Sequence, residues 1–349
     1  MAVPAPRKDI NWSQLGLGFN LTVNGHIEVR HHQSTNQWTA PTLIANPNIS
    51  ISGLSPALNY GQQCYEGLKA LRSPNNTISV FRPDFHWSRL CRSAEALCLP
   101  PPPKDLFLEC IRRAVAANAE FVPPADSDAY LYIRPVLFGA SARLALAPPE
   151  EVILAVYVQP ARPYHGSEAV DGLVLEDFDR AAPRGMGGYK VGGNYAPVWR
   201  HAAKAKEMGY GITLHLDSAT RTLVEEFSTS GFLGHKTVDG KDVLVVPKAH
   251  GAIASTTSDS MVRLAEREGW VVESAKVPFA SLGGLDEVVA VGTAAAAVPI
   301  QRGKSADTEG WCWEVTGFVQ PPPALGSLSM LGSLAHMVFG RGMKVSAAS

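Results

Sequence analysis

The sequence predicts an α+β fold with two domains, and three observations lead to this prediction. The chain has 349 residues, which is enough for two domains that each bury a core. Its first half mixes strand-like and helix-like segments, as α+β domains do. Residues 160–175 then lose regularity and contain Pro160, Pro163 and Gly166. We therefore expect a small N-terminal α+β domain at 1–165, an interdomain linker at 166–180 and a larger C-terminal domain at 181–349.

The first half is expected to contain at least three strands and two helices. Residues 78–83, 129–136 and 151–159 are rich in aromatic and β-branched residues and are predicted to be strands. A helix is predicted at 84–99, because the proline run 100–103 would end it. A second helix is predicted at about 105–121.

In the second half, strands are predicted at 173–176, 211–216, 244–247 and 287–294, and helices at about 197–208 and 261–268. Hydroxyl side chains cluster at 254–260, directly before the last helix. Such a cluster fits helix capping. It equally fits a phosphate cradle, because backbone N–H groups and the helix dipole converge at a helix start. The small-residue turn after strand 287–294 has the same two interpretations, a plain strand-to-loop junction or accessible backbone amides.

Composition argues against several classes of protein. Charged residues make up 18% of the chain and the net charge is -1, so we expect no nucleic-acid partner. Apolar runs are interrupted well before the roughly 18 residues that a membrane helix needs. The first residues lack the apolar core of a secretory signal, so the cytosol is the default expectation and a mitochondrial location stays open. Five cysteines without metal-ligand spacing predict reduced thiols in an intracellular protein, and no metal site.

One lysine stands out because it lies among glycines. In Gly-Gly-Tyr-Lys-Val-Gly-Gly-Asn-Tyr-Ala-Pro, residues 187–197, Lys190 is the only charged residue. Glycines allow tight backbone turns and let another molecule approach closely. A lysine in an apolar, partly dry pocket loses its proton more easily and becomes the nucleophile that Schiff-base chemistry requires. The alternative is a glycine-rich surface loop that happens to carry a lysine, and the stretch alone does not decide between them.

Other features of the second half suit the same chemistry. An acidic residue follows a strand, two small-residue turns could bind a phosphate, and several tyrosines lie near these stretches. Pyridoxal 5'-phosphate (PLP) needs a lysine to hold it and a carboxylate that keeps its pyridine nitrogen protonated, which makes the ring an electron sink. It also needs amides, hydroxyls and an arginine for its phosphate. We therefore expect PLP as the cofactor.

Six motifs, in the family's order, give the chain a strong resemblance to the fold type IV, PLP-dependent (class IV) aminotransferases, specifically the branched-chain amino acid aminotransferase family. They are NYGQQCYEGLKALR at 59–72, FRPDFHWSRL at 81–90, YLYIRP at 130–135, GGYKVGGNYAP at 187–197, VEEF at 224–227 and VGTAAAAVPI at 291–300. The resemblance implies the two-domain fold of the D-amino acid aminotransferase type, with the PLP-binding domain at 181–349. It also implies a homodimer with the site between domains and near the partner subunit.

The resemblance assigns roles to the residues around the cofactor. Lys190 is expected to be the catalytic Schiff-base lysine and to move the proton, and Tyr195 to hydrogen-bond the cofactor's phenolic oxygen. Glu226 matches the partner of the pyridine nitrogen, with Glu225 as the alternative, because alternation along a strand points only one of them inward. Arg89 matches the phosphate arginine; otherwise it is a surface charge on a helix.

The remaining expected contacts lie in two phosphate turns and a substrate wall. The turns are Thr256 and Thr257, and Gly292, Thr293 and Ala294, of which Ala294 is also expected to face the substrate. The wall over the substrate side chain and carboxylate is Tyr60, Tyr65, Tyr132 and Arg134, for which core packing is a serious alternative.

Four positions depart from the family pattern. Tyr65 stands where phenylalanine is usual, which would make the pocket slightly more polar, and Ser258 stands where an arginine is typical. Residues 227–231 lack the usual asparagine, and residues 294–297 are all alanine where some animal members have a redox-active cysteine pair. The second and third changes could loosen cofactor binding or shift the substrate range.

The expected function is ping-pong transamination between a hydrophobic, branched-chain L-amino acid and 2-oxoglutarate, as in branched-chain amino acid biosynthesis. Three alternatives share the fold: an (R)-selective amine or D-amino acid transaminase, an aminodeoxychorismate lyase, or a biosynthetic paralogue of broader specificity. A non-catalytic binding module is a further alternative, and the intact Lys190, Glu226 and Arg89 argue against it.

Overall fold

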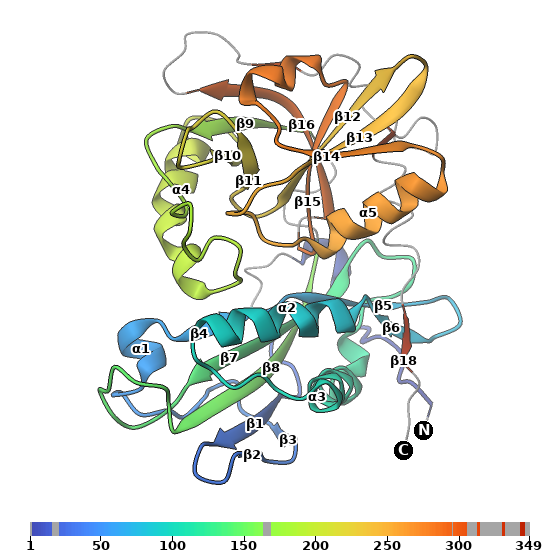
Figure 1. The fold of residues 1–349 in the computed structure, drawn as a ribbon. Coiled ribbons are helices and arrows are strands. Elements are labelled where there is room, and N and C mark those ends of the chain that lie inside the picture. Colours follow the sequence, from blue (N-terminus) through green and yellow to red (C-terminus); the bar gives the residue numbers. More distant parts are fainter. Residues whose placement is uncertain are drawn as a thin grey trace. The chain divides into compact units, whose positions relative to one another are not determined.

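The computed structural model describes residues 2–15, 21–162, 169–294, 296–305, 313–314, 330–331 and 343–345. Contacts divide the chain into two compact units (Figure 1). Unit 1 consists of Met1–Tyr164, Tyr189–Gly193 and Gly342–Ser349, and unit 2 of His165–Gly188 and Asn194–Arg341. Cys312 and residues 166–168 of the predicted linker lie outside the described residues.

Unit 1 is built on one nine-stranded sheet. Its strands are β1 (His26–His32), β2 (Gln37–Trp38), β3 (Thr42–Ile44), β4 (Gln63–Tyr65), β5 (Leu68–Arg72), β6 (Ile78–Val80), β7 (Tyr130–Gly139), β8 (Glu151–Ala161) and β18 (Met343–Val345). Their order is β18-β6-β5-β7-β8-β1-β2, with β3 beside β1 and β4 beside β7, and these pairs are antiparallel. The longest ladder joins β7 to β8 and buries Leu131, Ile133 and Ile153.

The helices of unit 1 are α1 (Pro56–Tyr60), α2 (Pro83–Ala96) and α3 (Lys104–Ala117), with short 3-10 turns at Trp12–Gln14 and Ala119–Phe121. Helix α2 starts with a proline, whose missing N–H costs nothing in a first turn. It buries His86, Arg89, Leu90 and Ser93, which share one helical face. Polar side chains of α2 are therefore held inside unit 1.

Unit 2 is built on a second nine-stranded sheet that is mixed. Its strands are β9 (Val170–Leu175), β10 (Ile212–Leu216), β11 (Val224–Phe227), β12 (Gly231–Val238), β13 (Lys241–Pro247), β14 (Val271–Ala275), β15 (Glu287–Gly292), β16 (Ala296–Ser305) and β17 (Trp313–Glu314). The order is β11-β10-β9-β16-β15-β12-β13-β14, with β17 beside β16. Strand β9 pairs in parallel with β10 and β16, as β13 does with β14.

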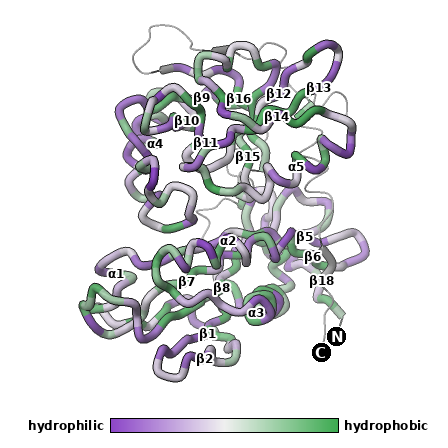
Figure 2. Tube along the Cα trace, viewed as in Figure 1, coloured by the Kyte–Doolittle hydropathy of each residue, from purple (hydrophilic) through white to green (hydrophobic). Residues whose placement is uncertain are grey.

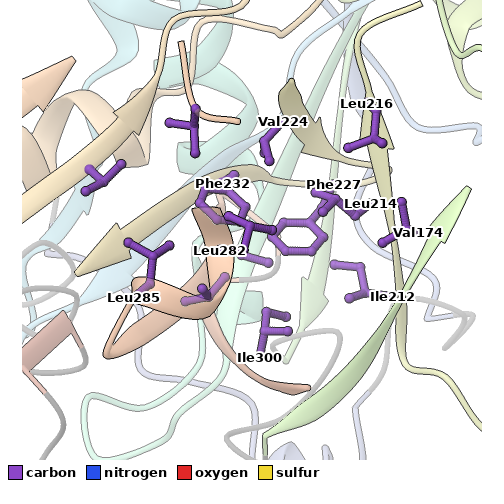
Figure 3. Close-up of a cluster of buried hydrophobic side chains, with 14 of the residues drawn as sticks. Val174, Ile212, Leu214, Leu216, Val224, Phe227, Phe232, Leu282, Leu285 and Ile300 are labelled. Atoms are coloured by element: carbon purple, nitrogen blue, oxygen red, sulfur yellow. The ribbon is translucent and has the colours of Figure 1, made fainter. Parts of the chain in front are cut away.

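The hydrophobic core of unit 2 centres on two stacked rings. Phe227 and Phe232 lie 5.6 Å apart between centroids, and Leu214, Leu282 and Ile300 close around them (Figure 3). Strand β15, in the middle of this sheet, is mainly hydrophobic (Figure 2). Unit 2 also contains the helices α4 (Trp199–Glu207) and α5 (Thr256–Arg267), with 3-10 turns at Ala196–Val198 and Phe279–Gly284. The 3-10 turn at Gly192–Asn194 spans the residues where the chain leaves unit 1 for unit 2.

The predicted α+β class is confirmed, and most predicted elements are found within a few residues of their expected bounds. One prediction was wrong: the last helix starts at Thr256 and not at Met261. The Ser255 hydroxyl accepts the Ser258 N–H at 3.1 Å, so the hydroxyl cluster forms the cap and first turn rather than the approach to the helix. The helix predicted at 105–121 ends at Ala117, because Asn118 bonds back to the Ala114 carbonyl.

Two further observations bear on the predicted organisation. Strand β9 lies inside the predicted linker 166–180, and residues 189–193 of the lysine stretch belong to unit 1 by their contacts. The division into a small domain and a PLP-binding domain stays a prediction. Within the described part of the chain, no helix is long and apolar enough to cross a membrane.

Candidate active site

The backbone around Lys190 is fixed within unit 1. Val191 forms an antiparallel bridge with Cys64, and the Tyr65 N–H donates to the Lys190 carbonyl at 3.1 Å. The Lys190 N–H donates to the Ser93 hydroxyl of α2 at 3.0 Å. A Cβ at Gly192 would meet the end of the Gln63 side chain, so the backbone passes close to β4 at this glycine. The lysine segment is thus held against β4 and α2 and is no loose surface loop.

A lysine, an arginine and two tyrosines meet in unit 1. The Lys190 Nζ lies 4.8 Å from the centre of the Tyr65 ring, and the Arg134 guanidinium carbon lies 4.6 Å from the same centre. Arg134 also donates to the Tyr132 hydroxyl at 3.0 Å. Residues 132 and 134 share one side of β7, because side chains alternate along a strand. The arrangement places the Lys190 amine and the Arg134 guanidinium around one aromatic ring, and the guanidinium suits a ligand that carries a carboxylate.

Tyr60, the fourth residue of the predicted substrate wall, lies elsewhere. It ends α1 and is 48% exposed in the single chain. Among the described contacts of unit 1, it takes no part in the cluster around Tyr65.

Arg89 belongs to a buried ion-pair network, which excludes the alternative of a surface charge. Its Nε and Nη2 donate to the two carboxylate oxygens of Glu66, each at 2.7 Å, and the side chains are 8% and 0% exposed. The His86 Nδ1 donates to Glu66 at 2.6 Å. Burial alone would raise the pKa of Glu66, but Arg89 and then His86 hold that pKa far below its usual range. Burial lowers the pKa of His86 despite Glu66, so the imidazole is neutral.

Glu226 is the inward carboxylate of strand β11 in unit 2. Its Oε1 lies 2.5 Å from Arg180 Nη2, and its Oε2 accepts the Ile253 N–H at 3.1 Å. The neighbouring Glu225 faces the other side of the strand, where its carboxylate occupies the space beside Gly251. Burial raises the pKa of Glu225, which Arg180 partly opposes. The two acidic residues therefore have different surroundings, and Glu226 is the deeply buried one.

The two predicted phosphate turns lie close together in unit 2. Thr256 and Thr257 are the first residues of α5 and are buried. A Cβ at Gly231 would approach the Ser258 hydroxyl to 3.0 Å, and a Cβ at Gly292 would approach the Ser230 hydroxyl to 3.4 Å. Turn 228–231 thus links the start of α5 to the end of β15, where Thr293 and Ala294 follow.

These groups fit the phosphate of PLP. Helix-start N–H groups and hydroxyls are what a phosphate monoester binds. The one acidic residue in the first turn of α5, Asp259, is paired with Arg263 at 3.0 Å. The cradle, the buried Glu226 and the segment of Lys190 therefore supply the kinds of groups that PLP needs.

Unit 2 also fixes the chain on both sides of the lysine. A Cβ at Gly187 would meet the Gly251 carbonyl oxygen at 2.6 Å, so the backbone passes close to residues 250–252. The Asn194 side chain donates to the Met186 carbonyl at 2.8 Å. Tyr195 is half-buried and its carbonyl accepts the Val198 N–H, which starts the turn before α4.

Sequence reasoning missed the residues that support the predicted site. Glu66, His86 and Ser93 in unit 1, and Arg180 and Ser230 in unit 2, were given no role. The spacing of His86 and Arg89 on a helix signals a shared face and could have pointed to His86. No local signal marks Arg180, which meets Glu226 only through the fold.

Comparisons with known proteins place the chain in a family. The model of the family "Amino-transferase class IV" matches residues 63–302. The aminotransferase poxL of Penicillium oxalicum is 50% identical over 297 residues, 85% of this chain and 81% of the relative. The transaminase htyB of Aspergillus rugulosus is 46% identical over 334 residues, covering 93% and 88% of the two chains. The chain belongs to the class IV aminotransferases, which use PLP.

Solved structures of other proteins share the fold of this chain. The branched-chain amino acid aminotransferase of Escherichia coli matches with a TM-score of 0.70 and 24% identity, over 86% of this chain and 92% of that one. The branched-chain aminotransferase of Thermoproteus uzoniensis matches with a TM-score of 0.68 and 23% identity, over 85% and 91%. The protein is therefore an aminotransferase with the fold type IV architecture, as the sequence predicted.

Proposed function

We propose that this aminotransferase transfers the amino group of a hydrophobic, branched-chain L-amino acid to 2-oxoglutarate in a ping-pong reaction. The observation that supports it most directly is the cluster of Lys190, Tyr65 and Arg134, which sets a carboxylate-binding cation beside the amine. The solved structures with this fold include enzymes named as branched-chain aminotransferases. The curated relatives are named only as aminotransferases or transaminases.

The residues around the cofactor have distinct tasks in this proposal. Bound PLP supplies an electron sink that makes the proton on the substrate α-carbon removable. Lys190 holds the cofactor and moves that proton with its amine. Glu226 would pair with the pyridine nitrogen of the bound cofactor, and Tyr195 would donate to its phenolic oxygen. Arg89 supplies a positive charge for the phosphate. The cradle of unit 2 supplies the other contacts, namely Thr256, Thr257, Gly292 and Thr293.

The substrate is held by the second cation of unit 1. Arg134 binds the carboxylate, because a guanidinium matches its planar geometry. The rings of Tyr65 and Tyr132, with Tyr60 and Ala294, form the wall beside the substrate side chain. Apolar and aromatic surfaces favour aliphatic side chains such as those of leucine, isoleucine and valine.

Two other reactions of the same fold remain candidates. An (R)-selective amine or D-amino acid transaminase would use the same lysine with a different arrangement of the substrate groups. A broader-specificity biosynthetic paralogue is favoured by one observation: the ring beside Arg134 and Lys190 is that of Tyr65, which carries a hydroxyl where phenylalanine is usual. Polar donors would then be accepted along with aliphatic ones.

Assembly as a homodimer is part of the proposal. Five of the large apolar side chains that are exposed in unit 1 lie in two segments, residues 54–60 and 144–146, and gathered apolar residues are typical of an interface. They are Leu54, Leu58, Tyr60, Leu144 and, at 88% exposure, Leu146. The end of α1 meets the end of β7, where Gly139 N–H donates to Gln62, so these residues border one end of the sheet. A cytosolic location stays a prediction from the sequence.

The proposal is tested with a donor panel and two variants. L-, D- and amine donors are scored for 2-oxo acid formation by the wild-type enzyme, and branched-chain L-amino acids should give the highest kcat/KM. Lys190→Ala should lower turnover by at least about three orders of magnitude while leaving the fold intact. Arg134→Met should raise KM for amino acids roughly tenfold or more and spare amines, which carry no carboxylate.

The variant Arg112→Met is the matched control, since Arg112 pairs with Glu109 within α3 and has no proposed role. Preference for D-amino acids or amines would overturn the branched-chain assignment. Retained turnover in Lys190→Ala would overturn the role of the lysine.

A further inference from the structure

Arg180 is a buried arginine that the resemblance gave no role. It follows β9 in unit 2, and its side chain is 3% exposed. Its Nη2 faces three oxygens: Oε1 of Glu226 at 2.5 Å, the Gly187 carbonyl at 3.1 Å and the Gly251 carbonyl. One guanidinium therefore joins the predicted cofactor carboxylate to the glycine that lies shortly before Lys190.

The carboxylate of Glu226 is fixed at both oxygens. Arg180 binds Oε1, and the Ile253 N–H donates to Oε2 at 3.1 Å. Gly251 and Ile253 belong to one short segment, so Arg180 also holds the backbone that provides the second donor. A buried carboxylate stays ionised only when such partners compensate for lost hydration. Arginine is suited to this because its guanidinium keeps its charge at any working pH.

Arg180 supplies positive charge beside Glu226, whereas His215 and Glu225 do not. His215 lies opposite Glu226 in the β10–β11 ladder, and burial, followed by the charge of Arg180, lowers its pKa to about 3. The imidazole is therefore neutral near pH 7. Glu225 lies near Arg180 and is another acidic group. Without Arg180, the buried Glu226 carboxylate would lack its cationic partner.

We propose that Arg180 is a positioning residue for the cofactor: it holds the Glu226 carboxylate in the orientation that meets the pyridine nitrogen and anchors Gly187, on the approach to Lys190. This inference rests on the proposed pairing of Glu226 with that nitrogen. Removing Arg180 should weaken the contact at one atom of the cofactor while contacts to the phosphate stay intact.

The test compares two ligands that differ at this atom. One is PLP, and the other is its analogue with carbon in place of the pyridine nitrogen. Dissociation constants for both are measured by equilibrium titration of the cofactor-free, full-length protein. Arg180→Met should raise the Kd of PLP roughly tenfold and leave that of the analogue within about twofold. In a Glu226→Gln background, Arg180→Met should change the Kd of PLP less than about twofold, because it acts through Glu226.

Glu226→Gln alone tests the pairing on which the inference rests. If it weakens both ligands equally, the proposed role of Glu226 fails. If it weakens PLP selectively but Arg180→Met weakens both ligands by the same factor, Arg180 only supports the fold and the inference is wrong. Arg302→Met is the matched control. Arg302 lies on β16, three strands from β11, and pairs with Asp171 of β9 at 2.7 Å.

Arg180→Met leaves a buried carboxylate without its cation and could fail to fold. Arg180→Lys then carries the test, since it keeps the charge and loses the planar fork. It should raise the Kd of PLP roughly threefold or more while sparing the analogue. Equal weakening of the two ligands by Arg180→Lys would overturn the inference.

Discussion

Each unit of this aminotransferase buries one arginine–glutamate pair, and the two pairs are arranged in opposite ways. In unit 1, Arg89 is the residue proposed to meet the cofactor, and Glu66 supports it through two hydrogen bonds. In unit 2, Glu226 is the residue proposed to meet the cofactor, and Arg180 supports it through one nitrogen. In both units, the buried charged residue that is proposed to meet the cofactor is paired with a residue of opposite charge. Such pairing is needed because burying an isolated ion is too costly.

The two pairs also differ in the hydrogen bonds between arginine and carboxylate. Glu66 is fully buried and receives three hydrogen bonds from Arg89 and His86. Glu226 shares the Nη2 of its arginine with two backbone carbonyls. We therefore expect the pair of unit 1 to contribute more to stability, and the pair of unit 2 to respond more to the cofactor.

The largest expected effect is on the free energy of unfolding. Glu66→Gln should lower it by about 3–5 kcal/mol, because Arg89 would stay buried without its counter-charge. Glu226→Gln should cost less, because Arg180 keeps its carbonyl partners. Urea denaturation of the two variants measures the difference, with Glu109→Gln as a surface control expected to change stability by less than about 1 kcal/mol. An equal or larger loss in Glu226→Gln would contradict the greater contribution of the unit 1 pair to stability.

A smaller effect is expected when the charge of Arg89 is kept and its geometry is lost. Arg89→Lys can no longer pair with both oxygens of Glu66, so stability should fall by about 1–2 kcal/mol. The Kd of PLP should rise roughly tenfold. Thermal unfolding of the cofactor-free protein and cofactor titration separate the two effects. An unchanged Kd would show that Arg89 supports the fold and does not meet the phosphate.

The buried His215 of unit 2 should make the stability of the fold depend on pH. The pKa of His215 is lowered to about 3, mainly by burial, whereas an unfolded histidine titrates near about 6.5. As the pH falls from about 6.5 toward 3, the unfolded chain takes up a proton that the folded chain refuses, so stability decreases. The slope is at most about 1.4 kcal/mol per pH unit for this group. His215→Asn should flatten the dependence in urea denaturation at several pH values, and an unchanged slope would contradict the prediction.

The smallest effect is expected at Tyr65. Tyr65→Phe restores the residue that the family usually has, and the ring under Lys190 and Arg134 is kept. We expect kcat/KM for aliphatic donors to change by less than about threefold, since cation–π contacts depend on the ring. Polar donors should lose more than aliphatic ones if the hydroxyl broadens specificity. A donor panel measured on both enzymes decides this.

The sequence predicted those parts of the site that local patterns mark. Lys190 stands out among glycines, and Arg89 lies at a helical spacing from His86. Alternation in β11 predicted that one of two adjacent glutamates would be buried, and Glu226 is that residue. The class of fold followed from the mixture of segments, because amphipathic periodicity is a local property.

The supporting partners could not be predicted, because they depend on strand order. Arg180 follows β9, and Glu226 lies on β11, two strands away in the order β11-β10-β9, so nothing near either residue in the sequence indicates their ion pair. Glu66 and Arg89 meet because α2 packs its polar face toward the end of β4. The start of α5 was misplaced for a different reason: serine and threonine are typical both of caps and of first turns.

The assignment of residues 189–193 to unit 1 has a consequence for building chimeras from related aminotransferases. An exchange of residues 1–164 would transplant Tyr65 and Ser93 but leave Lys190 from the other parent. Residues in contact would then come from different parent proteins. These contacts are the bridge from Cys64 to Val191 and the hydrogen bonds of Lys190 to Tyr65 and Ser93. A donor fragment that includes the five-residue insert 189–193 keeps these contacts within one lineage, so recombination points should flank the lysine on both sides.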